Sequence, residues 1–155
     1  EAAGMALFTG TFENKVDGKG RVSLPADYRD LLTDADQRSF YIFPSPNLDA
    51  LEACDEEFMQ RVADSIEEQA DMFSDEEDGL SYIISSARRV QYDSTGRFVL
   101  PAEFAEHAGI DGKASFVGMN QRFQIWAPEK YAVREAEKRQ RAKGVTLKLK
   151  KRGGE

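Results

Sequence analysis

One short motif occurs twice in the chain. Residues 17–26 read DGKGRVSLPA and residues 93–102 read DSTGRFVLPA, so every shared residue is displaced by 76 positions. A repeat that keeps its spacing this closely indicates two copies of one supersecondary unit. We therefore expect the two halves of the chain to fold alike and to pack about a pseudo-twofold axis.

The motif predicts a strand, a tight turn, a second strand and a short helix. An aspartate ends an alternating stretch, and its carboxylate can accept hydrogen bonds from N–H groups of the turn. The glycine three positions later allows a positive φ, and the proline suits the first turn of a helix because it has no N–H to donate. The residues assigned to this structural role are Asp17, Gly20, Pro25, Asp93, Gly96 and Pro101.

Each motif is followed by a short helix and then by apolar runs. The helices are expected over residues 25–32 and 101–108, and Gly109 is expected to end the second. The runs predicted as strands are residues 40–43, 48–53, 115–119 and 123–126. The expected fold class is therefore mainly β with short helices, an α+β arrangement of two units with a helical insert between them.

The paired motifs resemble the MraZ family of bacterial transcriptional regulators. The resemblance rests on two Asp-x-x-Gly-Arg turns, each followed by Leu-Pro-Ala, and extends over about residues 5–143. Further agreement comes from residues 12–17, from Tyr28-Arg29 and from residues 107–109. The resemblance implies two AbrB/SpoVT-like swapped-hairpin units that form a small β-barrel-like domain. It also implies a ring-shaped homo-oligomer that binds repeated DNA boxes upstream of the division and cell-wall gene cluster.

We expect the following division of the chain. Residues 1–4, which precede Met5, are interpreted as an expression scar. The rest is expected to comprise unit 1 at 11–57, the acidic helical insert at 58–86, unit 2 at 87–130, and a basic C-terminal helix and tail at 131–155.

Acidic residues are concentrated in one part of the chain. The formal net charge of −7 argues against a nucleic-acid partner, but residues 48–80 carry −12 and the remainder carries +5. The acidic part predicts two helices, one over 55–72 and one begun by the capping box Ser74–Glu77. One interpretation is a solvated face that covers the sheet. The other is a surface that keeps DNA on the opposite face and meets a neighbouring subunit.

The C-terminal stretch has the opposite charge. Residues 138–152 contain eight basic residues and no acidic ones. Such a block is typical of a flexible tail, expected here from Gly144 onward. Attraction to DNA phosphates and docking on the acidic helices of an adjacent chain are the alternatives. The alternation of Val145, Leu147 and Leu149 also permits an added strand.

Arginines in the two turns are the main candidates for DNA contact. A guanidinium offers a rigid fork that suits phosphate or the edge of guanine, although an ion pair between each arginine and its turn aspartate would be a purely structural role. The first turn adds two lysines where the second has Gln91 and Thr95. Two arginines on the strand that leads into the second turn are candidates to compensate. The predicted DNA-binding residues are Lys15, Lys19, Arg21, Arg88, Arg89 and Arg97.

Other functional classes find little support in the sequence. With one cysteine, Cys54, and one histidine, His107, no metal-ligand cluster or nucleophilic dyad is expected, and His107 is interpreted as a partly buried structural residue. We expect no enzyme activity, no cofactor, no small-molecule substrate and no membrane segment, and a location in the cytoplasm at the nucleoid. The expected partners are double-stranded DNA and further copies of the chain. The alternative is an antitoxin-like or scaffold protein whose main partner is another protein.

Overall fold

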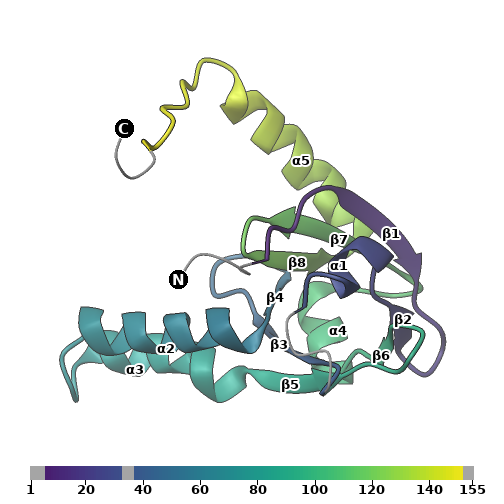
Figure 1. The fold of residues 1–155 in the computed structure, drawn as a ribbon, viewed down its shortest axis with the longest axis horizontal. Coiled ribbons are helices and arrows are strands. Elements are labelled where there is room, and N and C mark those ends of the chain that lie inside the picture. The colour runs from purple at the N-terminus through teal and green to yellow at the C-terminus, as the bar shows by residue number, and fades with distance from the viewer. Residues whose placement is uncertain (1–5, 33–36, 152–155) are drawn as a thin grey trace.

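The computed structural model describes residues 6–32 and 37–151 (Figure 1). The predicted scar at 1–4 and Arg152 of the basic tail lie outside the described residues. The strands are β1 (Thr11–Lys15), β2 (Arg21–Ser23), β3 (Ser39–Pro44), β4 (Leu51–Cys54), β5 (Arg88–Gln91), β6 (Arg97–Val99), β7 (Lys113–Met119) and β8 (Arg122–Trp126). The helices are α1 (Ala26–Arg29), α2 (Glu56–Gln69), α3 (Asp75–Ser86), α4 (Ala102–Ala108) and α5 (Pro128–Ala142). The protein is therefore mainly antiparallel sheet with helices, an α+β fold as predicted.

The strands form one large sheet and one small ribbon. The six-stranded sheet has the order β1-β7-β8-β4-β3-β5, and β2 pairs with β6 in a separate two-stranded sheet. The predicted barrel is not found among the described residues. The large sheet stays open, with β1 and β5 as its edges, because β2 and β6 pair with each other instead of bridging those edges.

The two halves exchange strands. Each half contains strand, strand, short helix, strand, strand and helix in the same order. However, β1 of the first half pairs with β7 of the second, so that Phe12 lies opposite Phe116. In the same way β5 pairs with β3, so that Phe40 lies opposite Val90. Neither half therefore completes its own sheet, and the core depends on both.

The main core lies between one face of the large sheet and the layer of α1, α4 and the β2–β6 ribbon. Phe40, Ile42, Phe116 and Phe123 of the sheet are almost fully buried there. The covering layer contributes buried residues in pairs that are 76 positions apart: Val22 and Phe98, Leu24 and Leu100, and Tyr28 and Phe104. The sequence repeat is thus a repeat of core positions.

The motif helices differ in length from their prediction. Helix α1 covers 26–29 instead of 25–32, because the N–H groups of Leu31 and Leu32 donate to carbonyls three residues back, in tighter turns. Helix α4 agrees with the prediction and ends at Gly109, which has φ of 68° and so serves as a left-handed cap.

The opposite face of the sheet is covered in two places. Tyr131 of α5 packs on Trp126 and Val117, and Met59 of α2 packs on Phe43 and Cys54. Helix α2 contacts the sheet only near its start, and helix α3 only near its end. Beyond these ends the two helices extend past the sheet side by side (Figure 1). The interpretation of the acidic helices as a cover of the sheet therefore holds only at their bases, because the apolar residues that touch the sheet occur only there.

Cys54 lies in this second packing layer and is expected to be chemically inert. Its side chain is buried, its Sγ is 3.9 Å from Sδ of Met59, and burial raises the pKa of the thiol to about 12. Since the thiolate is the reactive form, a disulfide reagent at pH 8 should not modify the native protein and should modify it fully in urea. Cys54→Ser serves as the blank. Rapid modification of the native protein would show that this layer is open.

The C-terminal part begins as a helix and continues without regular structure. Helix α5 ends at Ala142, and residues 145–150 form neither helix nor strand, so the added strand that the alternation permitted is not present. In the ranges 6–32 and 37–151, no helix is long and apolar enough to cross a bilayer. The same ranges contain no group of His, Cys, Asp and Glu side chains that could hold a metal ion.

Candidate nucleic-acid interface

The first turn is organised by the carboxylate of Asp17. Its Oδ1 accepts hydrogen bonds from the backbone N–H groups of Lys19 and Arg21, both at 2.9 Å. Its Oδ2 accepts from Nε of Arg21 at 2.7 Å. Gly20, with φ of 83°, donates its N–H to the carbonyl of Asp17. The aspartate therefore shapes the turn and aligns the arginine side chain at the same time.

The second turn has the same backbone hydrogen bonds and a longer distance between its arginine and its aspartate. Oδ1 of Asp93 accepts from the N–H groups of Thr95 and Arg97, both at 2.9 Å, and from the Thr95 hydroxyl at 2.7 Å. Nε of Arg97 lies 3.5 Å from Oδ2 of Asp93, compared with 2.7 Å in the first turn. The threonine hydroxyl thus takes part of the role that the arginine plays in the first turn.

The β2–β6 ribbon joins the two turns symmetrically. The N–H of Leu24 donates to the carbonyl of Gly96, and the N–H of Leu100 donates to the carbonyl of Gly20. Val22 and Phe98 face each other across the ribbon and point into the core. Since side chains alternate along a strand, Arg21 and Arg97 share the outer, exposed face, where both also line a groove of about 310 Å³.

The predicted lysines lie near the first turn. Lys19 is exposed in the turn itself. Lys15 is exposed at the end of β1, opposite Lys113 of β7 in the strand register. Both lysines are therefore exposed beside the first turn.

Arg88 and Arg89 of β5 both contact protein groups. Nη2 of Arg88 lies 2.6 Å from a carboxylate oxygen of Glu103 in α4, and its guanidinium lies over the ring of Phe104 at 5.9 Å. Arg89 donates from Nε to the hydroxyl of Ser39 at 3.2 Å. As neighbours on one strand they point to opposite sides, and each is engaged with protein groups.

Arg29 is a cation that the sequence reasoning did not assign to this face. Its guanidinium, at the end of α1, lies so close to Gly96 that a Cβ on that glycine would collide with Nη1 of Arg29. The corresponding position in the second copy is Ala105, so the first turn has no such neighbour. The second turn, which lacks the lysines, thus receives a charge from the first half. Alignment of the two copies could have revealed that Arg29 corresponds to Ala105, but not that Arg29 lies against Gly96.

His107 also differs from its prediction. Its side chain is exposed, and its Nε2 lies 3.3 Å from the carbonyl oxygen of Leu48. The expectation of a partly buried histidine was wrong because α4 directs Phe104 and Ala108, rather than His107, toward the core.

The two turns should make the protein sensitive to acid. Hydrogen bonds from the backbone and guanidinium of Arg21 lower the pKa of Asp17 to about 2, and those from the backbone of Arg97 and the hydroxyl of Thr95 lower the pKa of Asp93 to about 2. A carboxyl whose pKa is lower in the folded state stabilises the fold above its unfolded pKa of about 4, and this stabilisation is lost as the pH falls through the folded value.

We therefore expect the urea midpoint of the parent protein to fall between pH 4 and pH 2, with a shallower fall in the variant that carries Asp17→Asn and Asp93→Asn. Urea titrations at a series of pH values measure this. Parallel curves for the two proteins would contradict the role given to the carboxylates.

Comparisons with known proteins agree with the motif. A family described as "MraZ protein, putative antitoxin-like" matches residues 7–69 and again residues 83–148. A protein of Pelagibacter ubique named transcriptional regulator MraZ is 35% identical over 154 residues, which cover 94% of this chain and 95% of the relative. A protein of the same name from Rickettsia bellii is 34% identical over 148 residues, which cover 93% of this chain and 98% of the relative. One from Rhodospirillum rubrum is 36% identical over 129 residues, which cover 82% of this chain and 83% of the relative. These relatives are named as regulators and not as enzymes, in agreement with the expectation for this chain. Two family matches in tandem, together with relatives of this identity and coverage, show that the chain belongs to the MraZ family.

Proposed function

We propose that the protein is a sequence-specific transcriptional regulator that binds double-stranded DNA through the outer face of the β2–β6 ribbon. The observation that carries the proposal is the placement of Arg21 and Arg97 on one exposed face, each aligned by the aspartate of its own turn. Two-stranded ribbons can enter the major groove, and arginine forks suit both phosphates and guanine edges. The regulator name of the relatives supports the same conclusion.

The residues on this face divide into two roles. Arg21 and Arg97 are the proposed base readers. Lys15 and Lys19, which are exposed, and Arg29, which is half-buried beside the second turn, are proposed to bind phosphates, because cations around the turns can follow the DNA backbone without reading sequence. Arg88 and Arg89 remain proposed secondary contacts, which would have to exchange the protein partners that they hold.

The finer features implied by the family are also proposals for this chain. They are swapped-hairpin units at 11–57 and 87–130, an acidic helical part at 58–86 and a basic end at 131–155. We further propose a ring-shaped homo-oligomer in the cytoplasm, located at the nucleoid, that binds repeated boxes upstream of the division and cell-wall genes. One ribbon covers a small footprint, so several linked copies on several boxes would raise the affinity through effective concentration.

A gel shift tests the proposed function. Labelled DNA from upstream of the gene cluster that contains the gene for this chain should be shifted at concentrations at which shuffled DNA is not. The affinity should fall with salt, because phosphate contacts release counterions. Equal binding of both DNAs at every salt concentration would leave only non-specific attraction.

The word "antitoxin-like" in the family description favours one second candidate. In that case a protein partner, and not DNA, would be the main ligand of the same fold. Failure to shift any upstream fragment, together with co-purification of one stoichiometric protein from the source cells, would favour this alternative.

A further inference from the structure

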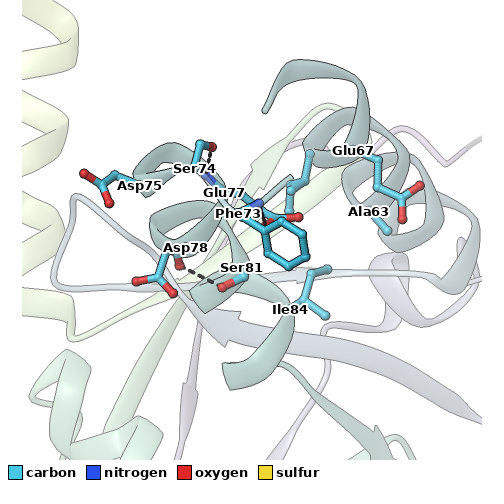
Figure 2. A pocket seen from close by; sticks show the side chains of 10 residues that line it. Ala63, Glu67, Phe73, Ser74, Asp75, Glu77, Asp78, Ser81 and Ile84 are labelled. Carbon is cyan, nitrogen blue, oxygen red and sulfur yellow. Dashed lines mark hydrogen bonds between the residues drawn. The ribbon is translucent and has the colours of Figure 1, made fainter. Parts of the chain in front are cut away.

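The part of α2 and α3 that extends past the sheet encloses a groove. It has a volume of about 550 Å³. Figure 2 shows side chains of both helices and of the turn around it, among them Ala63 of α2, Phe73 of the turn and Ile84 of α3. Ile66 completes the apolar part of the lining. We refer to this feature as the arm groove.

Phe73 is the most exposed apolar residue of the arm groove. The side chain of Phe73 is 91% exposed, and its neighbour Met72 is 73% exposed. Phe73 also has φ of 69°, a left-handed conformation that is uncommon for a bulky residue, and its N–H donates to Oε1 of Glu77 at 2.8 Å. The turn between α2 and α3 therefore leaves the ring of Phe73 exposed to solvent. Exposed apolar clusters with a polar rim are typical of interaction sites.

Carboxylates surround the arm groove. Glu67 of α2 and Asp75, Glu77 and Asp78 of α3 line it together with the apolar residues, as Figure 2 shows. Their mutual repulsion favours an occupant that brings positive charge. The occupant should therefore be both apolar and basic.

The described end of this same chain has that chemistry. Residues 143–151 read KGVTLKLKK, and Val145, Leu147 and Leu149 are 71%, 81% and 85% exposed. In an extended chain these three side chains would share one face. The lysines have long flexible stems that can reach carboxylates beside an apolar contact. An extended chain advances about 3.3 Å and a helix about 1.5 Å per residue, so residues 145–149 match the length of α3.

We propose that the basic segment 143–151 of one copy binds in the arm groove of a second copy. Its apolar face covers Phe73 and Ile84, and its lysines pair with the carboxylates of the rim. A second copy is favoured over the chain's own segment because α5 and the α2–α3 arm leave the sheet in different directions in Figure 1, with the segment at the far end of α5. The contact needs no DNA and is independent of the proposed DNA binding by the ribbon.

Disulfide trapping between copies tests the proposal. One chain carries Ser81→Cys in the arm groove and a second, of different tagged size, carries Leu147→Cys; the native Cys54 is buried. Mild oxidation of the mixture should give a mixed dimer on a non-reducing gel. Ser65→Cys, which is exposed on α2 and does not line the groove, is the matched control and should give no such dimer above background. Equal trapping at both positions would overturn the proposal.

Charge reversal provides a second test that does not depend on cysteine chemistry. Glu67→Lys with Asp78→Lys should reduce self-association in sedimentation velocity. A chain that carries Lys148→Glu and Lys150→Glu should do the same, and mixing the two variants should restore the association. No loss in either variant, or no restoration, would refute the contact. A monomeric disulfide in one chain that carries both Ser81→Cys and Leu147→Cys would refute the role of the second copy.

Discussion

Arg21→Ala is expected to abolish nearly all binding to the upstream DNA. The side chain lies on the exposed ribbon face, and Asp17 holds it through a 2.7 Å hydrogen bond to Nε, which leaves the remaining donors of the guanidinium to face a ligand. Loss of one base-reading arginine costs about 1–3 kcal/mol per contact. In an oligomer the loss recurs in every copy, so the effect on a repeated operator is multiplied.

Two matched variants separate base reading from phosphate contact. Lys19→Ala, in the same turn, should weaken binding to all DNA similarly and lower the salt slope by about one. Arg97→Ala should have a smaller effect than Arg21→Ala, because the second turn lacks the flanking lysines. Gel shifts with specific and shuffled DNA at several salt concentrations measure all three.

The melting temperature of Arg21→Ala must be measured beside its binding. Arg21 also forms an ion pair with Asp17. Because an exposed ion pair contributes little to stability, the variant should remain folded. Parental affinity in a folded Arg21→Ala protein would refute the role of this residue. Lost binding that merely follows unfolding would assign it a structural role instead.

Tyr28→Ala is expected to cause the largest loss of stability. Tyr28 is fully buried, packs against the rings of Phe8, Phe12 and Phe123, and donates its hydroxyl to the carbonyl of Gly10 at 2.8 Å. Truncation of a large buried aromatic side chain costs about 3–5 kcal/mol. Since the free energy of unfolding of a native protein is about 5–15 kcal/mol, a substantial share of the stability should be lost.

Tyr28→Phe is the matched control. It keeps the ring and removes the hydroxyl, so it should cost about 0.5–1.5 kcal/mol, the net contribution of one hydrogen bond. Urea titration of both variants gives the two free energies of unfolding. If Tyr28→Ala is no less stable than Tyr28→Phe, the aromatic cluster does not hold α1 on the sheet in the way described here.

Much of the protein could be predicted from its sequence because the determining signals are local. The turn aspartates, the glycines with positive φ and the prolines before α1 and α4 act over a few residues, and their spacing revealed the repeat. The cap of α3 at Ser74 and the stop of α4 at Gly109 are equally local. The pseudo-twofold relation expected from the repeat was also enough to expect the two turn arginines on one face.

The pairing of distant segments was decided only in the tertiary structure. No local signal says that β1 joins β7 or that β2 joins β6, because strand pairing depends on which arrangement covers the most apolar surface across the whole chain. The same pairing leaves the sheet open, where the family resemblance had implied a small β-barrel-like domain. It also brings the guanidinium of Arg29 against Gly96 and directs Arg88 to Glu103. The local roles of residues in turns and helix ends could thus be predicted from the sequence, whereas the distant partners of those residues were decided by packing between the two halves.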